Sequence, residues 1–454
     1  MAWYNTNWLF RKKVTIPNLT TFNGMTTSNL TNFPVYVNLA NMGADFFSKV
    51  RTDGGDIRVT LSDEVTEVPR ELVSINTSTQ TGEFYFRANT LNGNATTDFY
   101  IYFGNASATN PAKSATFGAY NVWNSVYRLV LHMDEYSPAG AIQAGTSFIN
   151  SANNTYLPYI IGTPGTGTLL DGPIGKAINM SASNCYMSMN DPVDMTEYTI
   201  STYARPLGAG ALVVKNLGTN NASTSYSENL RISGSTFQHY YFDGASVTLN
   251  SNIGALNTSN YFHLAGTAKN GGTGFLYQQG LIGSATDPTG TLWTGGDTFN
   301  MFGRDGSSAN WFIGYVEEFR ISPIQLSYNW ITTESSNIRF NNIFITAGTL
   351  ETGPSPNLQS LTPAIDTTGN AANTNLILDF DQNVSVGTGN VTIEKIPNLN
   401  IGGTFQGDLA ELMMLNTLTD SDRQKIEGYL AWKWFGGNNN LPSNHPYKLY
   451  APRN

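Results

Sequence analysis

Asp134-Glu135 and Glu317-Glu318 are adjacent pairs of acidic residues. Retaining glycoside hydrolysis needs two carboxylates about 5 Å apart. On a β-strand such a pair must share one face, whereas adjacent residues point to opposite faces. We therefore expect neither pair to be catalytic, and we assign no catalytic residue. Glu318 and Glu411 hold equivalent places in two similar segments, and we expect both to be structural carboxylates that accept hydrogen bonds from turn amides.

Aromatic residues in polar, loop-rich stretches could perform a second kind of chemistry, the stacking of a ring on a sugar. The candidates are Trp293, Trp311, Tyr240 and Tyr241. A large flat ring that carries a polar group suits this contact. A position in the core or between domains is the alternative for each of them.

The cysteine and the histidines do not indicate a metal centre. Cys185 is the single cysteine, which excludes a disulfide framework and a cysteine-based zinc site, and we expect it to be a small buried apolar residue. His132, His239, His263 and His445 show no metal-ligand spacing. We expect the first and third to form local hydrogen bonds and His445 to pack near the end of the chain.

The composition is typical of a β-rich protein with several domains. Of 454 residues, 13 % are charged and 12 % aromatic, and the formal net charge is −9. Disordered chains carry more charge and fewer aromatic residues, and an acidic chain without a lysine and arginine cluster is unsuited to nucleic acid. No run approaches the roughly 18 apolar residues of a membrane span, and the start does not resemble a signal peptide. We expect no nucleic-acid partner, no membrane span and no cofactor. We also expect an exit from the cell by a route other than a signal peptide, such as lysis inside a virus particle.

Alternation of apolar and polar residues predicts antiparallel strands over residues 1–118. Phe33, Val35 and Val37 fall on one face, with Tyr36 opposite. Such runs, separated by turn residues, indicate a β-sandwich.

Several motifs in this region resemble a prokaryotic and phage domain family of unknown function. They are Trp8 with Arg11 and Val14-Thr15-Ile16, then Asn32-Phe33-Pro34-Val35-Tyr36-Val37, Asp53-Gly54-Gly55-Asp56-Ile57-Arg58, and Tyr100-Ile101-Tyr102-Phe103-Gly104-Asn105. The last resembles the family's closing Tyr-Tyr-Gly-Asn. The resemblance implies a β-sandwich that usually precedes a lectin-like module, and it implies no activity.

Residues 119–353 resemble a concanavalin A-like, laminin G-like jelly roll. The motifs that carry the resemblance are His132-Met133-Asp134-Glu135, Leu276-Tyr277-Gln278-Gln279-Gly280 and Gly314-Tyr315-Val316-Glu317-Glu318-Phe319-Arg320-Ile321-Ser322. A short helix is predicted for 326–336, where Leu326, Trp330 and Ile331 form a stripe.

The jelly-roll resemblance leaves activity and metal binding open. This fold hosts both lectins and glycoside hydrolases, and its hydrolases typically carry a Glu-x-Asp-x-x-Glu run, which this sequence lacks. Laminin G-like domains often hold calcium at the rim. Oxygen ligands there could come from Asp134, Asp171 or Asp305, and the choice among them stays open.

Two smaller pieces follow a Pro-Ser-Pro linker. Residues 354–396 resemble the first half of a bacterial Ig-like domain, and 397–454 form a strand-helix module that resembles the closing segment of lectin-like domains. Neither is large enough to be stable alone. We expect the apolar stripe of the last helix to pack on a β-sheet of this chain or of another copy; it comprises Ile426, Tyr429, Leu430 and Trp434.

The predicted fold class is all-β: serial jelly-roll sandwiches, an Ig-like segment and a short C-terminal helix. The favoured function is a non-enzymatic bacteriophage virion protein, a tail fibre, adhesin or capsid decoration, that attaches to host-surface glycans and contacts other virion proteins and its own copies. The alternative is a secreted bacterial carbohydrate-binding protein or glycoside hydrolase module.

Overall fold

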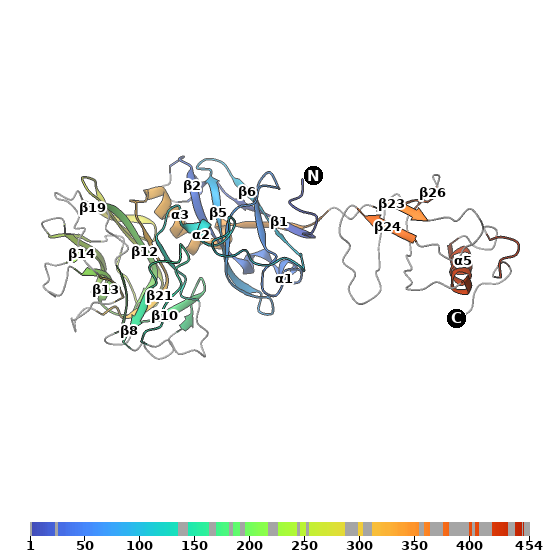
Figure 1. Cartoon of the computed structure of the whole chain (residues 1–454). Helices are drawn as coiled ribbons and strands as arrows, with labels where there is room; N and C mark the ends of the chain where they lie inside the picture. Colours follow the sequence, from blue (N-terminus) through green and yellow to red (C-terminus); the bar gives the residue numbers. More distant parts are fainter. Residues whose placement is uncertain are drawn as a thin grey trace. The chain divides into compact units, whose positions relative to one another are not determined.

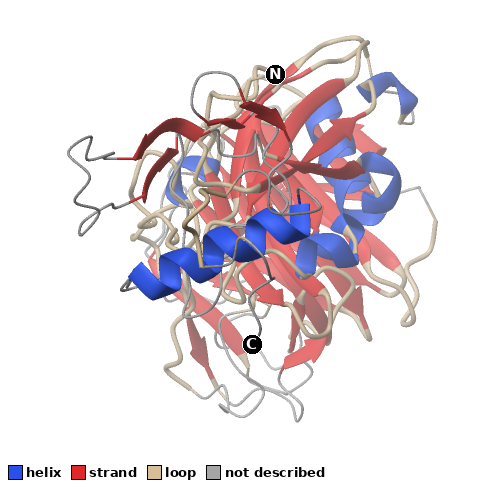
Figure 2. Ribbon diagram, turned by 90° about the vertical axis from the view of Figure 1, so that its right-hand side faces the viewer, coloured by secondary structure: helices blue, strands red, loops and turns tan. Residues whose placement is uncertain are grey.

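The computed structural model describes most of the chain up to Gly353 and shorter parts of the remainder. The described ranges are 2–22, 26–134, 144–162, 169–180, 185–190, 196–216, 226–242, 246–250, 254–286, 298–302, 311–353, 358–363, 376–380, 399–401, 405–407, 420–434, 441–446 and 448. The chain divides into two compact units between Gly353 and Pro354. Strands make up 42 % and helices 14 % of the described structure, which confirms the predicted all-β fold (Figure 2).

The N-terminal part of the first unit is a sandwich of two antiparallel sheets. One sheet has the order β22-β1-β6-β3, formed by Thr346–Thr352, Phe10–Ile16, Thr97–Phe103 and Arg58–Leu61. The other has the order β2-β5-β4, formed by Leu30–Asn38, Thr81–Leu91 and Arg70–Asn76. Short helices α1 (Ala44–Phe47) and α2 (Tyr120–Trp123) accompany them. Strand β22 follows the second sandwich in the sequence, so this sheet is completed by a segment that returns from it.

Two of the sequence motifs meet at one turn of this sandwich. The buried carboxylate of Asp56 accepts hydrogen bonds from the backbone N–H of Gly104 (2.6 Å), Asn105 (3.3 Å) and Arg51 (3.1 Å). Gly104 has φ +86°, and a Cβ there would overlap the ring of Phe10. The turn that ends β6 therefore requires both the glycine and the aspartate.

The second sandwich of the first unit packs an eight-stranded sheet on a seven-stranded one. The first sheet has the order β19-β18-β17-β12-β21-β10-β9, with β7 paired to β21; its strands are Leu281–Thr286, Gly274–Gln278, Phe262–Lys269, Glu197–Pro206, Gly314–Ser322, Lys176–Asn179, Leu169–Asp171 and Leu129–Leu131. The second has the order β16-β15-β14-β13-β20-β11-β8; its strands are Ser246–Asn250, Thr236–Phe242, Tyr226–Ser233, Gly210–Asn216, Thr298–Met301, Tyr186–Asn190 and Tyr159–Ile161. Apolar residues from both sheets fill the space between them, and Cys185 is buried among them as predicted.

Helix α3 (Tyr328–Arg339), followed by α4 (Asn341–Phe344), joins the two sandwiches (Figure 1). The structure confirms the predicted helix, and Trp330 and Ile331 are buried in the same apolar core as β2. Asn337 pairs with the backbone of Tyr36 on the edge strand β2, accepting from its N–H (2.7 Å) and donating to its carbonyl (2.9 Å). An edge strand is thereby covered rather than left open.

The second unit contains two strand pairs and one helix among its described residues. Strand β23 (Leu358–Pro363) pairs with β24 (Leu376–Phe380), β25 (Leu399–Ile401) pairs with β26 (Phe405–Gly407), and α5 spans Asp420–Trp434. On α5, Ile426, Tyr429 and Leu430 are half-buried. In the described part of the chain, no helix is both long and apolar enough to cross a membrane.

Candidate functional site

A layer of buried polar side chains lies between the two sandwiches of the first unit. We call it the interface cluster; it consists of Glu71 on β4, Glu83 on β5, His132 just after β7, Glu318 and Arg320 on β21, and Glu334 on α3. Each of these residues is less than a tenth exposed. Four carboxylates therefore share a buried space with one guanidinium and one imidazole. Buried charges are tolerated only when they are paired and hydrogen-bonded, so their contacts determine what the cluster can do.

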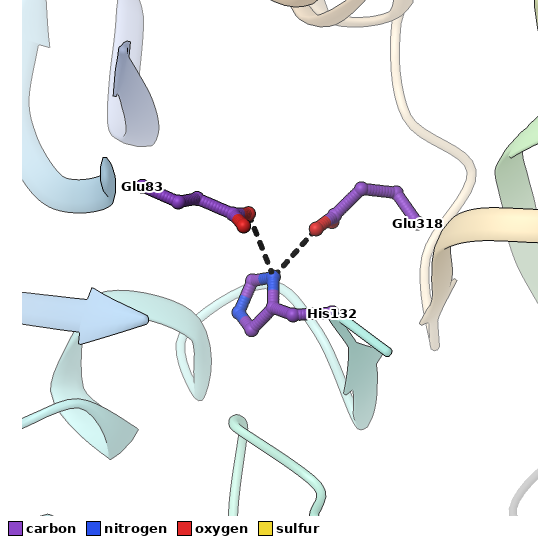
Figure 3. Close-up of side chains that lie close together, drawn as sticks. All are labelled: Glu83, His132 and Glu318. Carbon is purple, nitrogen blue, oxygen red and sulfur yellow. Dashed lines mark hydrogen bonds and ion pairs between the residues drawn. The ribbon is translucent and has the colours of Figure 1, made fainter. Parts of the chain in front are cut away.

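His132 is at the centre of the cluster. Its Nδ1 lies 2.6 Å from Oε1 of Glu318 and 3.7 Å from Oε1 of Glu83 (Figure 3). Its Nε2 lies 3.2 Å from Oε2 of Glu71. Burial alone would lower the pKa of His132, but the charges of Glu318 and Glu71 raise that pKa well above its usual value. The ring is stacked on Tyr85 at 5.0 Å, which fixes its orientation.

Glu71 is a fully bonded carboxylate. Its Oε2 accepts from Nε1 of Trp123 (2.5 Å), and its Oε1 accepts from the hydroxyl of Ser151 (2.7 Å). Burial opposes its ionisation, but His132 and these donors hold the pKa of Glu71 below its usual value. Glu71 is thus an ionised acceptor that holds His132 by Nε2 and leaves Nδ1 directed at the other two carboxylates.

Glu83 is the poorly paired member of the cluster. Although 1 % exposed, its carboxylate accepts no hydrogen bond from the described residues. Burial and the neighbouring charge of Glu318 raise the pKa of Glu83 well above its usual value. Most buried polar groups have a partner, so this carboxylate requires a specific explanation.

A β-bulge directs two adjacent glutamates toward the cluster. In the pairing of β12 with β21, Tyr203 lies opposite Glu318 but the next residue, Ala204, lies opposite Val316, so Glu317 is the extra residue. The prediction that Glu317 and Glu318 point to opposite faces is therefore wrong, because a bulge breaks the strict alternation of a strand. Glu317 accepts from the backbone N–H of Ile174 and Gly175 at 2.5 Å. Burial raises the pKa of Glu317 to about 8, although these two amides oppose the shift.

Glu318 was predicted to accept hydrogen bonds from turn amides, but its neighbour Glu317 accepts them instead. Glu318 instead contacts His132 and Arg320; Nη2 of Arg320 donates to its Oε2 at 2.8 Å. Glu411, the equivalent residue in the second segment, lies outside the described residues.

The other half of the cluster is organised around Glu334. Its Oε2 accepts from the hydroxyl of Tyr127 (2.6 Å) and lies 3.5 Å from Nη1 of Arg320, while its Oε1 accepts from the hydroxyl of Ser201 (2.7 Å) and lies 2.9 Å from Nε2 of His263. Burial opposes ionisation, but these partners lower the pKa of Glu334 to about 2. His132 and His263 therefore bond residues far from them in sequence, and the prediction of local hydrogen bonds is wrong for both.

A cavity of about 220 Å³ reaches His132 from the surface. Glu71, His132 and Ser151 are buried residues of its wall, and Asn110, Lys113 and Ile149 are exposed residues of the same wall. This volume is below the range of about 300–1,000 Å³ found for small-molecule sites. Water and small ions can enter such a space, whereas an oligosaccharide does not fit.

The candidate calcium ligands are not gathered into one site by the described residues. Asp134 lies on the wall of the cavity, and Asp171 is an exposed residue that pairs with Lys176. Asp305 lies outside the described residues, as does Glu135. Within the described residues, the group whose ligand atoms approach one another within 4.8 Å is Glu83, His132 and Glu318, which sequence spacing could not indicate.

The candidate sugar-binding residues are spread over the seven-stranded sheet and its loops. Trp311 is half-buried and stacks on Tyr186 of β11, with ring centroids 5.7 Å apart. Tyr240 and Tyr241 lie on β15, and nothing is described of their side chains; Trp293 lies outside the described residues.

Polar residues adjoin the stacked pair on the outer face of this sheet, the face opposite the apolar core. Met187, Met189, Phe299 and Met301 belong to the core, so Ser188 and Asn300, which lie between them and opposite each other across β11 and β20, occupy the outer face. The amide of Asn300 is 1 % exposed, yet its oxygen and nitrogen form no hydrogen bond to the described residues.

Comparison with known proteins finds one family match and several distant structural likenesses. The model of a domain of unknown function, DUF2341, matches residues 53–125, which overlap the region 1–118 whose motifs resemble a family of unknown function. No curated protein matches the chain.

The solved structures that resemble the chain share little sequence with it. The binding domain of Paraclostridial Mosquitocidal Protein 1 is 12 % identical with a TM-score of 0.37, and the alignment covers 47 % of this chain and 52 % of that one. The receptor-binding domain of botulinum neurotoxin C/D mosaic serotype is 14 % identical with a TM-score of 0.36, covering 47 % and 51 %. Domain 4 of AbnA, an extracellular arabinanase of Geobacillus stearothermophilus in complex with arabinotriose, is 16 % identical with a TM-score of 0.36, covering 45 % and 96 %. The chain thus spans about half the length of the two toxin domains.

Proposed function

We propose that the protein is a non-enzymatic glycan-binding protein, and that it serves as a tail fibre, adhesin or capsid decoration of a bacteriophage particle. The observation that supports glycan binding is the stacked aromatic pair Trp311 and Tyr186 beside Ser188 on the outer face of the seven-stranded sheet. Trp311 is half-buried and offers a ring for stacking on a sugar.

The arrangement of carboxylates supports a binding protein over a hydrolase. Glu83 and Glu318 are close enough in space to resemble a retaining pair. They are 1 % and 2 % exposed, however, and lie between two sandwiches, so a polysaccharide cannot reach them. The proximity of this pair is explained better by a role inside the protein.

The virion role is supported by the way the first unit is built. Helix α3 and a buried charge cluster lie between the two sandwiches, so the sandwiches form a stiff support without a disulfide. Loops at the end of such a sandwich can carry contacts to a host surface. Weak single-site binding to a glycan gains about 10²–10⁴-fold when many copies act together, as on a particle. We place the attachment to the particle, or to another copy, in residues 354–454.

Glycan-array screening of the full chain, followed by titration with the best ligand, tests the glycan-binding proposal. Trp311→Ala should reduce binding at least tenfold, whereas Tyr315→Ala, at another half-buried aromatic residue of the same sandwich, should leave binding unchanged. Mass spectrometry of purified phage particles tests the location. Cleavage of a polysaccharide by the purified protein, together with its absence from particles, would establish the hydrolase alternative.

A further inference from the structure

We propose that Glu83, His132 and Glu318 form a buried site for one divalent transition-metal ion, with Zn²⁺ as the best-suited ion, which clamps the N-terminal sandwich to the second one. One ligand atom from each residue lies within 4.8 Å of the others. Figure 3 shows the two carboxylates converging on the same ring nitrogen, Nδ1. The ligands come from β5, from the residue after β7 and from β21, so an ion here would bond to both sandwiches.

The first argument is the carboxylate of Glu83. Both of its oxygens are buried and accept no hydrogen bond from the described residues, although they lie beside Nδ1 of His132. A methyl group at Gly175 would overlap Oε2 of Glu83, and one at Gly172 would lie 2.5 Å from Oε1 of Glu317. The turn between these glycines thus packs its backbone directly against the two carboxylates. This close packing leaves no space for a larger ligand beside Glu83.

The second argument is the orientation of His132. A metal-bound histidine usually donates its other ring N–H to a carboxylate, which fixes the tautomer and turns the free nitrogen to the metal. Nε2 of His132 lies 3.2 Å from Glu71, whose carboxylate is held by Trp123 and Ser151. This arrangement presents Nδ1 to Glu83 and Glu318. Arg320 orients Glu318 in a similar way, because it donates a hydrogen bond to Oε2 of Glu318 and leaves Oε1 directed at His132.

The third argument is the donor set. The ligand atoms that converge are one imidazole nitrogen, of His132, and carboxylate oxygens of Glu83 and Glu318. The mixed nitrogen and oxygen donor set suits Zn²⁺ better than Ca²⁺, which takes oxygen ligands only. The cavity that reaches His132 and Glu71 provides a route for the ion.

The test uses the full chain, stripped with a chelator and then titrated with Zn²⁺, Mn²⁺ or Ca²⁺, with metal content measured by mass spectrometry and stability by thermal unfolding. We expect one Zn²⁺ per chain and a higher melting temperature with Zn²⁺ but not with Ca²⁺. Substitution with Co²⁺ should give the visible absorption bands of a cobalt ion bound by nitrogen and oxygen ligands.

Three variants separate a metal site from a purely structural cluster. Glu83→Gln should weaken Zn²⁺ binding by more than about 100-fold, because losing an outer partner alone, as in Glu71→Gln, costs about 10–100-fold. Without metal, Glu83→Gln should be at least as stable as the stripped parent protein, because it removes a buried carboxyl group that accepts no hydrogen bond from the described residues. Glu334→Gln, at the other end of the cluster, should lose stability but still bind one Zn²⁺.

The proposal is overturned if the stripped protein takes up no Zn²⁺, Mn²⁺ or Co²⁺, or if Glu83→Gln binds Zn²⁺ as tightly as the parent. A destabilised Glu83→Gln variant, combined with no metal uptake by the parent, would show instead that Glu83 and Glu318 share a proton. Neither outcome depends on glycan binding, which Trp311→Ala tests separately.

Discussion

Replacing Glu334 by glutamine should lower the free energy of unfolding of the first unit by about 3 kcal/mol at pH 7. The partners of Glu334 lower its pKa from 4.5 to about 2, and each unit of pKa shift corresponds to about 1.4 kcal/mol. Breaking a buried ion pair by removing one partner costs about 3–5 kcal/mol, so two separate arguments give similar magnitudes. Three neutral or cationic groups, Tyr127, His263 and Arg320, would lose the charge that they face.

The loss should depend on pH in one direction. A carboxylate whose pKa is lowered by folding contributes its full stabilisation above the pKa of the unfolded chain, near 4.5, and loses it as the pH falls toward 2. The stability difference between the parent protein and Glu334→Gln should therefore be largest at pH 5–7 and shrink between pH 4 and pH 2.5. Urea unfolding followed by circular dichroism measures it. Glu197→Gln, which removes a partly exposed pair with Lys269, is the control and should cost less than about 1 kcal/mol. A difference that is equal at all pH values, or no larger than that of the control, would refute the reasoning.

Two further predictions concern the N-terminal turn and the C-terminal helix. Asp56→Ala should destabilise the first unit by about 3 kcal/mol or more in urea unfolding, because three backbone N–H groups lose a charged acceptor. The control is Asp53→Ala, at the exposed aspartate of the same motif. Equal losses of stability for both variants would contradict the structural role given to Asp56. Leu430→Asp should make the second unit more sensitive to limited proteolysis, because the leucine is half-buried on α5. Lys425→Asp, at an exposed position of the same helix, should not change this sensitivity. Identical digestion patterns for the two variants would contradict the expectation that this helix face is covered.

Local features of the fold could be predicted because they depend on residues close in sequence. The alternation of Phe33, Val35 and Val37 predicts a strand at β2, and the stripe of Leu326, Trp330 and Ile331 predicts a helix at α3. The contact of Asp56 with the turn at Gly104 could not be predicted in this way, because the two residues are 48 positions apart. The alternation in β2 gave one wrong prediction, which concerns the exposure of Tyr36. Tyr36, expected opposite the core, is 2 % exposed because a second layer covers that face as well.

The outer face of the seven-stranded sheet was only partly predictable. An aromatic residue in a polar stretch singled out Trp311, but Tyr186, Ser188 and Asn300 join it through cross-strand pairing of β11 with β20. Those two strands are separated by more than a hundred residues, and nothing in the local pattern of either indicates the pairing. Ligand contacts on a sheet face require the register, which residue types alone do not supply.

The interface cluster shows why a buried group of charged residues could not be predicted from residue spacing. His132 meets Glu71 across 61 positions and Glu318 across 186, so a search for closely spaced ligands passes over all three. The adjacent pair Glu317-Glu318 was set aside because regular strands alternate, and a single extra residue in β21 reverses that conclusion. A bulge has no fixed signature in residue types, since it is selected by the pairing of β21 with β12 and by the space that the turn at Gly172 and Gly175 leaves. Carboxylates that look ordinary in the sequence thus acquire their special environment only when the two sandwiches close on each other. Buried charges at such a junction favour this one alignment of the sandwiches, because another alignment would separate Glu71, Glu318 and Glu334 from the partners that they have here.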